Sequence, residues 1–518
     1  MTRGTKRLLL VAAAVVAVSL GFIIEERVRG VVALGHWQAE MRAKGERLTI
    51  AEIVPPDPAN SACLFLGPQE VASRWAAVSS SFDSPPAMRY VAPGKAQAVW
   101  QAGSWRLERK RTNNWADAAL SLRPVMPAIE NVCADLTNQT FVVRLDYDQG
   151  FTMMLPHLAR YKGAAVTLRN ATQLALCQQR LDLATENLVA MAALADLSKG
   201  EGPVINELVR DAIAAIGVSA LWEALQADGW SDAQLAAIQA AWQKPDFMRG
   251  MARAFEVERA VGALFYDRGR YSLRQLFEIL QNAGVASWGA PGSTASPDQL
   301  GLAGEVLHSL VELGARSRYL VGLGVWRVSW VEQDQLRHQR LLQQAIDRMR
   351  RAASEKRFRA DLQPADQGTP CSRDLSSFAA DGWRRARYWV SMSLLPGLER
   401  SSDKAALAEA QRDLAVTALA IKRYQLRHGG PPDRLEALVP EFLPTAPRDW
   451  FADAPLHYRR KPDGSFLLYS VGPDGEDNGG DARPTTAGAE PSFTRTYDMV
   501  WPQPATPEEI ATFEWALR

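Results

Sequence analysis

An uncharged apolar run near the N-terminus constrains this chain more than any other feature. Leu8 to Ile24 carries no charged side chain, and its length is about the minimum for a helix that spans a bilayer. Arg3, Lys6 and Arg7 precede the run, and basic residues in this position stay on the cytoplasmic side of a membrane. The run predicts a bacterial inner-membrane protein with one transmembrane helix at residues 8–24 and its body in the periplasm.

A cleaved signal peptide is the alternative for the same segment. Ala17 and Ser19 are small enough to flank a cleavage site. The region has no lipobox cysteine, however, and charged residues follow Ile24 directly. These two features favour a retained anchor over a signal that is removed.

Length and charge limit the class of protein. A chain of 518 residues exceeds the size of most single cores, so we expect two or three domains. The formal net charge is +1, which leaves no excess of basic surface for a nucleic acid. The sequence therefore predicts no nucleic-acid partner.

The cysteines are far apart, at Cys63, Cys133, Cys177 and Cys371. They show none of the paired spacings of a zinc site. In an oxidising compartment they allow one or two disulfides, and buried free thiols are the alternative.

Amphipathic helical patterns follow one another after a mixed N-terminal region. The segments 170–200, 204–229, 231–243 and 247–267 each repeat apolar residues at helical spacing, and Ser231 is a predicted N-cap. Short joints between such helices are typical of a helical hairpin array.

The apolar segment 300–330 raises the question of a second membrane span. Glu305, Glu312 and several arginines interrupt it, and a central arginine costs about 2.5 to 3.5 kcal/mol to insert. The segment therefore predicts a buried helix pair. A surface loop at 282–299 precedes it, and a polar helix from Glu332 to about Leu362 follows.

The C-terminal part gives the clearest local signals. Apolar residues recur at spacings of three and four over 402–424, and the Gly-Gly-Pro-Pro sequence at 429–432 ends this helix. A short helix is expected at 433–443. Residues 456–460 and 465–471 then alternate around a Pro-Asp-Gly turn, which is typical of a β-hairpin.

This order of elements resembles the C-terminal globular part of the major pseudopilins of type II secretion systems. The resemblance rests on the motifs HGGPPDRLEALVPEFL and YSVGPDGEDNGGD and covers residues 405–481. In that family the second half of a long helix packs on a small antiparallel sheet, and a Gly/Asp-rich loop after the last hairpin holds calcium. The resemblance implies this fold here, with calcium as a cofactor and an envelope or secretion-system protein as partner.

The N-terminus departs from the pseudopilin pattern. Gly21, Phe22 and Glu26 have the spacing of the family's processing site, but the hydrophobic run precedes them instead of following. A peptidase facing the cytoplasm would not reach them, so we do not expect this chain to polymerise as a pilin subunit. The remainder, including RLDYDQGFTMMLPHLARYK at 144–162, resembles uncharacterised membrane-anchored helical bacterial proteins and implies no activity.

The predicted fold is mainly α with a small α+β C-terminal domain. It comprises an N-terminal transmembrane helix, a helical hairpin array, and a long helix packed on a small antiparallel sheet. The expected segments are a cytoplasmic stub and anchor at 1–30, a mixed region at 31–165, a solenoid-like helical domain at 166–370, a connector at 371–401, the pseudopilin-like part at 402–500 and a tail at 501–518.

The loop after the predicted hairpin carries the candidate metal ligands. They share the hard oxygen atoms that calcium prefers, and they are Asp474, Glu476, Asp477, Asn478 and Asp481. The loop is not an EF-hand, because Thr485 stands where that motif needs a bidentate glutamate. A phosphate site is disfavoured, since the acids would repel the anion. A calcium loop and a plain Asp/Gly turn both fit the pattern.

The sequence predicts no catalytic or cofactor-binding residue beyond this loop. The histidines are scattered, and His157 and His428 are interpreted as packing or capping residues. Glu256, Glu258 and Arg259 predict a buried polar cluster within the helical array. They do not predict an acid/base pair, because carboxylates two residues apart face different sides of a helix.

These patterns favour a structural role over an enzymatic one. We expect a membrane-anchored extracytoplasmic interaction protein, accessory to a type II secretion or pilus-like assembly. A periplasmic hydrolase with a site between the helical array and residues 57–165 is one alternative. The other is a peptide- or glycan-binding array, in which tryptophans such as Trp222 and Trp330 would line a groove.

Overall fold

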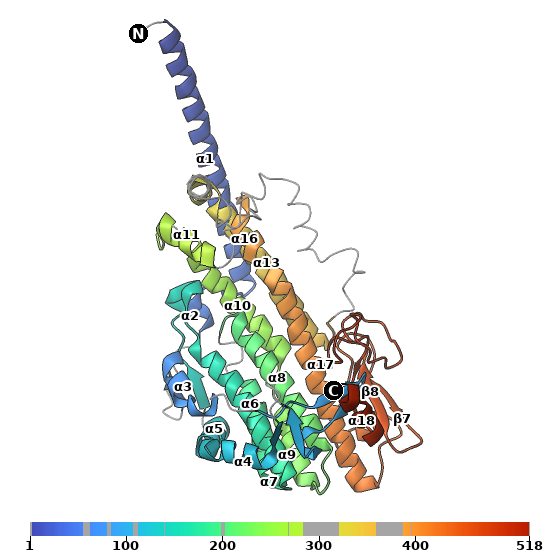
Figure 1. Cartoon of the computed structure of the whole chain (residues 1–518). Helices are drawn as coiled ribbons and strands as arrows, with labels where there is room; N and C mark the ends of the chain where they lie inside the picture. The colour runs from blue at the N-terminus through green and yellow to red at the C-terminus, as the bar shows by residue number, and fades with distance from the viewer. Residues whose placement is uncertain are drawn as a thin grey trace, which may run out of the picture.

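The computed structural model describes residues 3–54, 63–79, 84–106, 112–138, 140–197, 202–267, 269–282, 321–358, 387–394 and 396–516. Within these residues the chain is mainly helical with a few small sheets, as predicted (Figure 1). Some predicted features lie outside the described residues: the surface loop from 283 onward, the interrupting charges at Glu305 and Glu312, Cys371, and most of the connector at 371–401.

The N-terminal apolar run forms the first half of one long helix, α1 (Arg3–Ala43), which projects from the body (Figure 1). Leu9 is 54% exposed and Val18 is 73% exposed, so the described protein does not cover this half. Among the described residues α1 is the one helix long and apolar enough to cross a membrane. The predicted span is therefore present as a helix of suitable length and composition.

Beyond Ile24 the same helix becomes part of the body. Its buried positions are separated by three or four residues, so they form one stripe that packs along α13 (Val331–Glu355). The stripe consists of Glu26, Gly30, Leu34, Trp37 and Met41. Gly30 keeps the two helices close, because a Cβ atom there would lie 3.0 Å from Cγ of Gln333. The short helix α2 (Ile50–Ile53) follows α1.

The central array contains α6 (Pro156–Cys177), α7 (Leu181–Asp196), α8 (Val204–Leu225), α9 (Asp232–Trp242) and α10 (Phe247–Phe265). Ser231 caps α9 as predicted, since its Oγ accepts a hydrogen bond from the Gln234 amide at 3.2 Å. The single helix predicted at 170–200 is wrong. Gln179 has φ 56°, and the Arg180 amide donates back to the Ala175 carbonyl, which ends α6 and starts α7.

Two long helices complete the helical body. The polar helix predicted to reach about Leu362 is α13, which ends at Glu355 because Lys356 adopts the left-handed conformation with φ 50°. The predicted C-terminal helix is α17 (Pro396–His428), and it packs against α8, α9 and α10 as well as against the C-terminal sheet. Gly429, with φ 79°, ends it.

The predicted C-terminal hairpin is present as β7 (His457–Arg460) and β8 (Phe466–Ser470). A third strand, β9 (Met499–Val500), pairs with β8, so the sheet is antiparallel in the order β7-β8-β9. The short helix predicted at 433–443 is only a 3-10 turn at Leu435–Leu438. The next residue but one is Pro440, and an interior proline does not extend a helix.

Small strands join distant parts of the chain. β1 (Cys63–Leu66) pairs in parallel with β6 (Thr140–Val143), and β4 (Ser104–Arg106) pairs with β5 (Thr112–Asn114). β3 (Lys95–Gln97) lies between β2 (Arg89–Ala92) and β10 (Gln503–Pro504), so the C-terminal tail completes an N-terminal sheet. The remaining helices are α3 (Pro68–Arg74), α4 (Trp115–Leu122), α5 (Met126–Asn138), α11 (Leu273–Asn282), α16 (Trp389–Leu394) and α18 (Pro507–Ala516).

One continuous hydrophobic cluster runs from Val71 to Trp501 and takes side chains from α3, the central array, α13, α17 and the C-terminal sheet. The predicted boundaries at 402 and 500 fall within this cluster and do not mark a gap in packing. Trp222 and Trp242 are fully buried in it, and Trp326 and Trp330 are buried in a second cluster. These tryptophans are core residues and do not line a groove.

We predict that Gly217→Ala destabilises the body, because its Cβ atom would lie 2.3 Å from the buried Trp242 ring. The expected loss is about 1–3 kcal/mol of unfolding free energy. Gly35→Ala on exposed α1, where a Cβ atom meets nothing within 4 Å, is the control and should be neutral or stabilising by up to about 1 kcal/mol. Denaturant unfolding of the detergent-solubilised full chain measures both, and equal effects would contradict the packing argument.

Candidate functional site

The acidic loop after β8 uses its carboxylates to hold its own backbone. Oδ1 of Asp477 accepts hydrogen bonds from the Gly479 amide at 2.9 Å and from the Tyr469 hydroxyl at 3.0 Å. Asp481 forms a 2.6 Å ion pair with Arg483. The carboxylates of Asp477 and Asp481 are therefore both bonded to neighbouring groups of the sheet and the loop.

The other candidate ligands are also bonded locally. Oδ1 of Asp474 accepts from the Glu476 amide at 3.1 Å, and the Asn478 side-chain amide donates to the Glu476 carbonyl at 3.1 Å. These are short-range contacts of the Asx-turn type. Among the described residues, no group of three or more His, Cys, Asp or Glu side chains is placed to hold a metal ion. The calcium site stays a prediction.

Asp498, which sequence reasoning did not single out, organises this loop. Its two carboxylate oxygens accept hydrogen bonds from the amides of Asn478, Gly480 and Asp481, at 3.3, 2.7 and 2.9 Å. The side chain is buried beside β9, and burial raises the pKa of its carboxyl group. The sequence did contain a signal for this role. Asp498 directly precedes the apolar run Met499–Trp501, and an acid buried with such a run needs hydrogen-bond donors.

We predict that Asp498→Ala lowers the unfolding free energy by about 2–4 kcal/mol, because three backbone amides lose their acceptor. Asp474→Ala, which removes one exposed bond, is the matched control and should cost under about 1 kcal/mol. Denaturant unfolding of the full chain tests both, and equal effects would contradict the role of Asp498.

The predicted calcium site implies that millimolar calcium raises the melting temperature of the full chain. No rise, or an equal rise in the double variant Asp474→Ala, Asp477→Ala, would remove the metal site. Differential scanning calorimetry with magnesium as the comparison cation gives the measurement.

A buried charge cluster fastens the end of α1 to the body. Arg259 is fully buried, donates to the Arg47 carbonyl at 2.6 Å, and lies 3.3 Å from a carboxylate oxygen of Glu46. Glu256 binds Arg47 and Arg350, each at 2.8 Å. The predicted cluster around Glu256 and Arg259 is therefore confirmed, and it connects α10 and α13 to the segment that follows α1.

Glu258, the third member of that prediction, lies elsewhere. Its carboxylate accepts a hydrogen bond from the Val204 amide at 3.2 Å, at the start of α8. Burial raises the pKa of its carboxyl group. The two glutamates thus face different sides of α10, as their spacing of two residues predicts.

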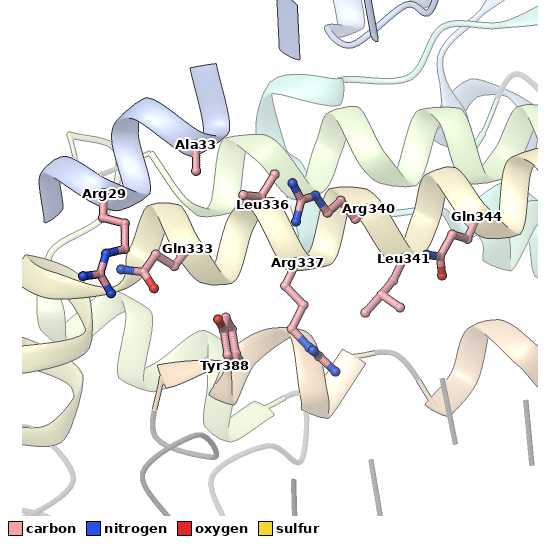
Figure 2. A pocket seen from close by; sticks show the side chains of 9 residues that line it. All are labelled: Arg29, Ala33, Gln333, Leu336, Arg337, Arg340, Leu341, Gln344 and Tyr388. Atoms are coloured by element: carbon pink, nitrogen blue, oxygen red, sulfur yellow. The ribbon is translucent and has the colours of Figure 1, made fainter. Parts of the chain in front are cut away.

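A pocket of about 360 Å³ lies in the seam between α1 and α13 (Figure 2). Arg29 and Ala33 of α1 line one side, and Figure 2 shows Arg29 and Gln333 next to each other at one end. Arg337 and Arg340 of α13 also line it. Tyr388 lies opposite α13, with its ring centroid 5.2 Å from Cζ of Arg337. The lining is basic, with no acidic residue.

Sequence reasoning missed this pocket. The residues from α13 are separated by three or four positions, so they share one helix face, but an arginine-rich polar helix also fits a solvated surface. Only the position of α1 turns that face into the wall of a pocket. Arg29, five residues after Ile24, was the available signal, because it places a cation just beyond the apolar run.

Three buried titratable groups, Asp334, His157 and His338, accept hydrogen bonds or pack in the interior. Asp334 accepts hydrogen bonds from the amides of Val390 and Ser391, at 3.0 and 3.1 Å, and burial raises its pKa to about 6. His157 and His338 are buried, and burial lowers the pKa of each to about 4. His428 stacks on Tyr424 at the end of α17, with ring centroids 4.1 Å apart. None of these residues lines the pocket between α1 and α13.

Comparisons with known proteins found no match for this chain among protein-family models, curated proteins or solved structures. The resemblance to pseudopilins therefore stays a prediction.

We predict that His338 makes the protein less stable in mild acid. Its pKa is about 4 in the folded state and about 6.5 when unfolded, so the unfolded state binds a proton first and stability is lost as pH falls through this window. The full effect is roughly 3 kcal/mol. His338→Gln removes the titration, so the unfolding free energy of wild type relative to this variant should fall between pH 7 and 4. A constant difference across that range would contradict the assignment.

Proposed function

We propose that this protein is a membrane-anchored structural or interaction protein whose body is held in a fixed position at the membrane surface. The observation that carries the proposal is the continuity of α1. One helix includes the exposed apolar half around Leu9 to Ile24 and the stripe from Glu26 to Met41 that packs on α13. A helix without an interruption transmits the orientation of the membrane span to the body.

The joint between anchor and body is rigidly bonded. The Gln333 side-chain amide donates to the backbone carbonyl and the carboxylate of Glu26, at 2.7 and 3.0 Å, and Arg387 lies 2.7 Å from the same carboxylate. The charge cluster around Arg259 fastens the far end of the stripe. A flexible linker would let the body move away from the membrane helix. This joint instead fixes the distance and the angle between the membrane helix and the body.

The bacterial inner membrane and a periplasmic body are part of this proposal. They are supported by the cations Arg3, Lys6 and Arg7 before the span. In that arrangement the joint lies at the periplasmic surface of the membrane, and the C-terminal part of α17 with the C-terminal sheet lies farther from it (Figure 1).

We further propose envelope proteins as partners, in a secretion or pilus-like assembly. The order of α17, hairpin and Asp/Gly loop supports this. Because α17 also packs against α8, α9 and α10, its sides are not free to assemble as a pilin stem does. The fold therefore favours an accessory that docks by its surface over a subunit that polymerises.

The first test of this proposal is topology in the cell. We expect the full chain to stay in the membrane after carbonate extraction and its body to be cleaved by protease added to spheroplasts. Removing residues 1–25 should release the body into the soluble periplasmic fraction only if a separate secretion signal is supplied. Release of the wild-type chain from the membrane by carbonate would contradict the proposed anchorage. Full protection of the body from protease would contradict the proposed orientation.

A second measurement identifies the partners. A photo-crosslinking amino acid at exposed Arg459 on β7, in the full-length protein, should capture secretion or pilus components, and a crosslinker at exposed Gly35 on α1 is the positional control. Capture of other envelope proteins through β7 would keep the docking role and reject the secretion assembly. Capture at Gly35 alone would reject docking through this sheet.

A further inference from the structure

A short helical segment at residues 321–329, just before α13, is apolar on the face that it turns toward the body. Leu323 and Trp326 of this segment, and Trp330 directly after it, are buried in the second hydrophobic cluster. They are separated by three and four residues, so they lie on one side of the helix. This inner face is therefore fully occupied by protein.

The outer face of the same segment is apolar as well. Val321, Val325 and Val328 are separated by four and three residues, so they form a single valine stripe, and they are 67%, 40% and 45% exposed. A Cβ atom on Gly322 would meet nothing within 4 Å. Arg327 is the one charged residue of the segment, and it is half-buried. Helices that are apolar all round are normally covered on every side, but the described protein leaves the valine stripe open.

The segment ends at the level where α1 leaves its apolar run. The guanidinium group of Arg387 lies 2.7 Å from the Glu26 carboxylate and 5.9 Å from the centroid of the Trp330 ring. Gln333, in the first turn of α13, donates to the Glu26 carbonyl. Glu26 follows Ile24 by two residues, which is about 3 Å along a helix, whereas the headgroup layer is roughly 5–8 Å thick. The end of the segment is therefore at headgroup depth when the apolar run spans the bilayer.

The segment lies across α1, with the body on its inner side. In Figure 1 the yellow segment before α13 is beside α1 and is seen nearly end-on, whereas α1 is seen along its length. The cluster on its inner face includes Phe265 of α10 and Trp389 of α16, and both helices belong to the body. Val28 of α1, one turn past the apolar run, is 56% exposed and adds an apolar side chain near the same level. The valine stripe is thus the face of the segment that is available to lipid.

We propose that the valine stripe is a second membrane contact, inserted among the upper acyl chains of the leaflet that faces the body. Its partner is the lipid bilayer itself, because a face of valine and glycine has no group that recognises a particular headgroup. The inference rests on the proposed membrane anchorage. A single spanning helix leaves a body free to rotate about the helix axis in the membrane. A second contact away from that axis fixes which side of the body faces the bilayer.

The test measures the depth of a fluorophore on the full chain in phosphatidylcholine nanodiscs. A nitrobenzoxadiazole label is attached to Val325→Cys in a chain whose native cysteines are replaced by alanine. Lipids with a nitroxide near the top of an acyl chain quench from the bilayer, and iodide quenches from water. We expect the nitroxide lipid to cause the larger loss of fluorescence at Val325. Leu120→Cys on α4, which is 67% exposed and far from the N-terminal half of α1, is the control and should lose fluorescence to iodide alone (Figure 1).

Polar substitutions test the valines themselves. Val321→Asn with Val328→Asn, in the chain labelled at Val325→Cys, should shift the loss of fluorescence from the nitroxide lipid toward iodide, because a side-chain amide is costly to remove from water. Quenching that does not change would overturn the valine stripe as the membrane contact. Both positions are exposed, so melting in the discs should match that of the labelled chain without these substitutions, which separates lost lipid contact from misfolding.

The contrary results at Val325 also differ from one another. Quenching by iodide alone would overturn the contact and show that the valine stripe is solvated. Protection from both quenchers would overturn the bilayer in favour of a protein cover, from this chain or from a second copy. A label at Val18→Cys, within the apolar run, reports on the anchor separately. If nitroxide lipid does not quench at Val18, the anchor proposal fails. If it quenches at Val18 and not at Val325, only the second contact fails.

Discussion

The packing of α1 on α13 is the constraint on which the rest of this structure depends. Beyond the exposed apolar run, protein covers only one face of α1. Leu34, Trp37 and Met41 are buried against the body, while the valines on the outer face stay exposed. Gly30 permits this close approach, because the backbone of α1 there lies against Gln333. The basic pocket between α1 and α13 depends on that contact.

The charge cluster at the end of α1 fixes the register between α1 and the body, which the apolar stripe alone does not. Apolar side chains pack with little preference for register, so a stripe alone allows one helix to slide along another. Arg259 is buried, and a buried guanidinium requires its acceptors in defined places, which Glu46 and the Arg47 carbonyl provide. The cluster therefore fixes the register of anchor and body, at the energetic cost of desolvating several charges.

The sequence predicted those features whose cause is local. The uncharged run, the Ser231 cap and the hairpin at β7 and β8 each depend on a few neighbouring residues, and each is present. The break at Gln179 was missed because the helical pattern continues across it and only backbone geometry ends the helix. Local acids also indicated the Asp/Gly loop, yet Asp498, which organises it, lies 17 to 20 positions away. The pocket was missed because its walls come from α1 and α13. These helices are distant in sequence, and no local pattern predicts that they lie side by side.

The pairing of β3 with β10 has a consequence for how the chain is made. Lys95 and Glu509 form an ion pair across 414 positions, and Trp222 donates to the Pro502 carbonyl across 280. Contacts this distant in sequence form late, because a long loop must close before they stabilise anything. The sheet at 89–97 is therefore complete only after β10 has been synthesised, more than four hundred residues later. Until that strand is made, the edge of β3 that β10 covers has no partner, and an open strand edge in an incomplete chain promotes aggregation.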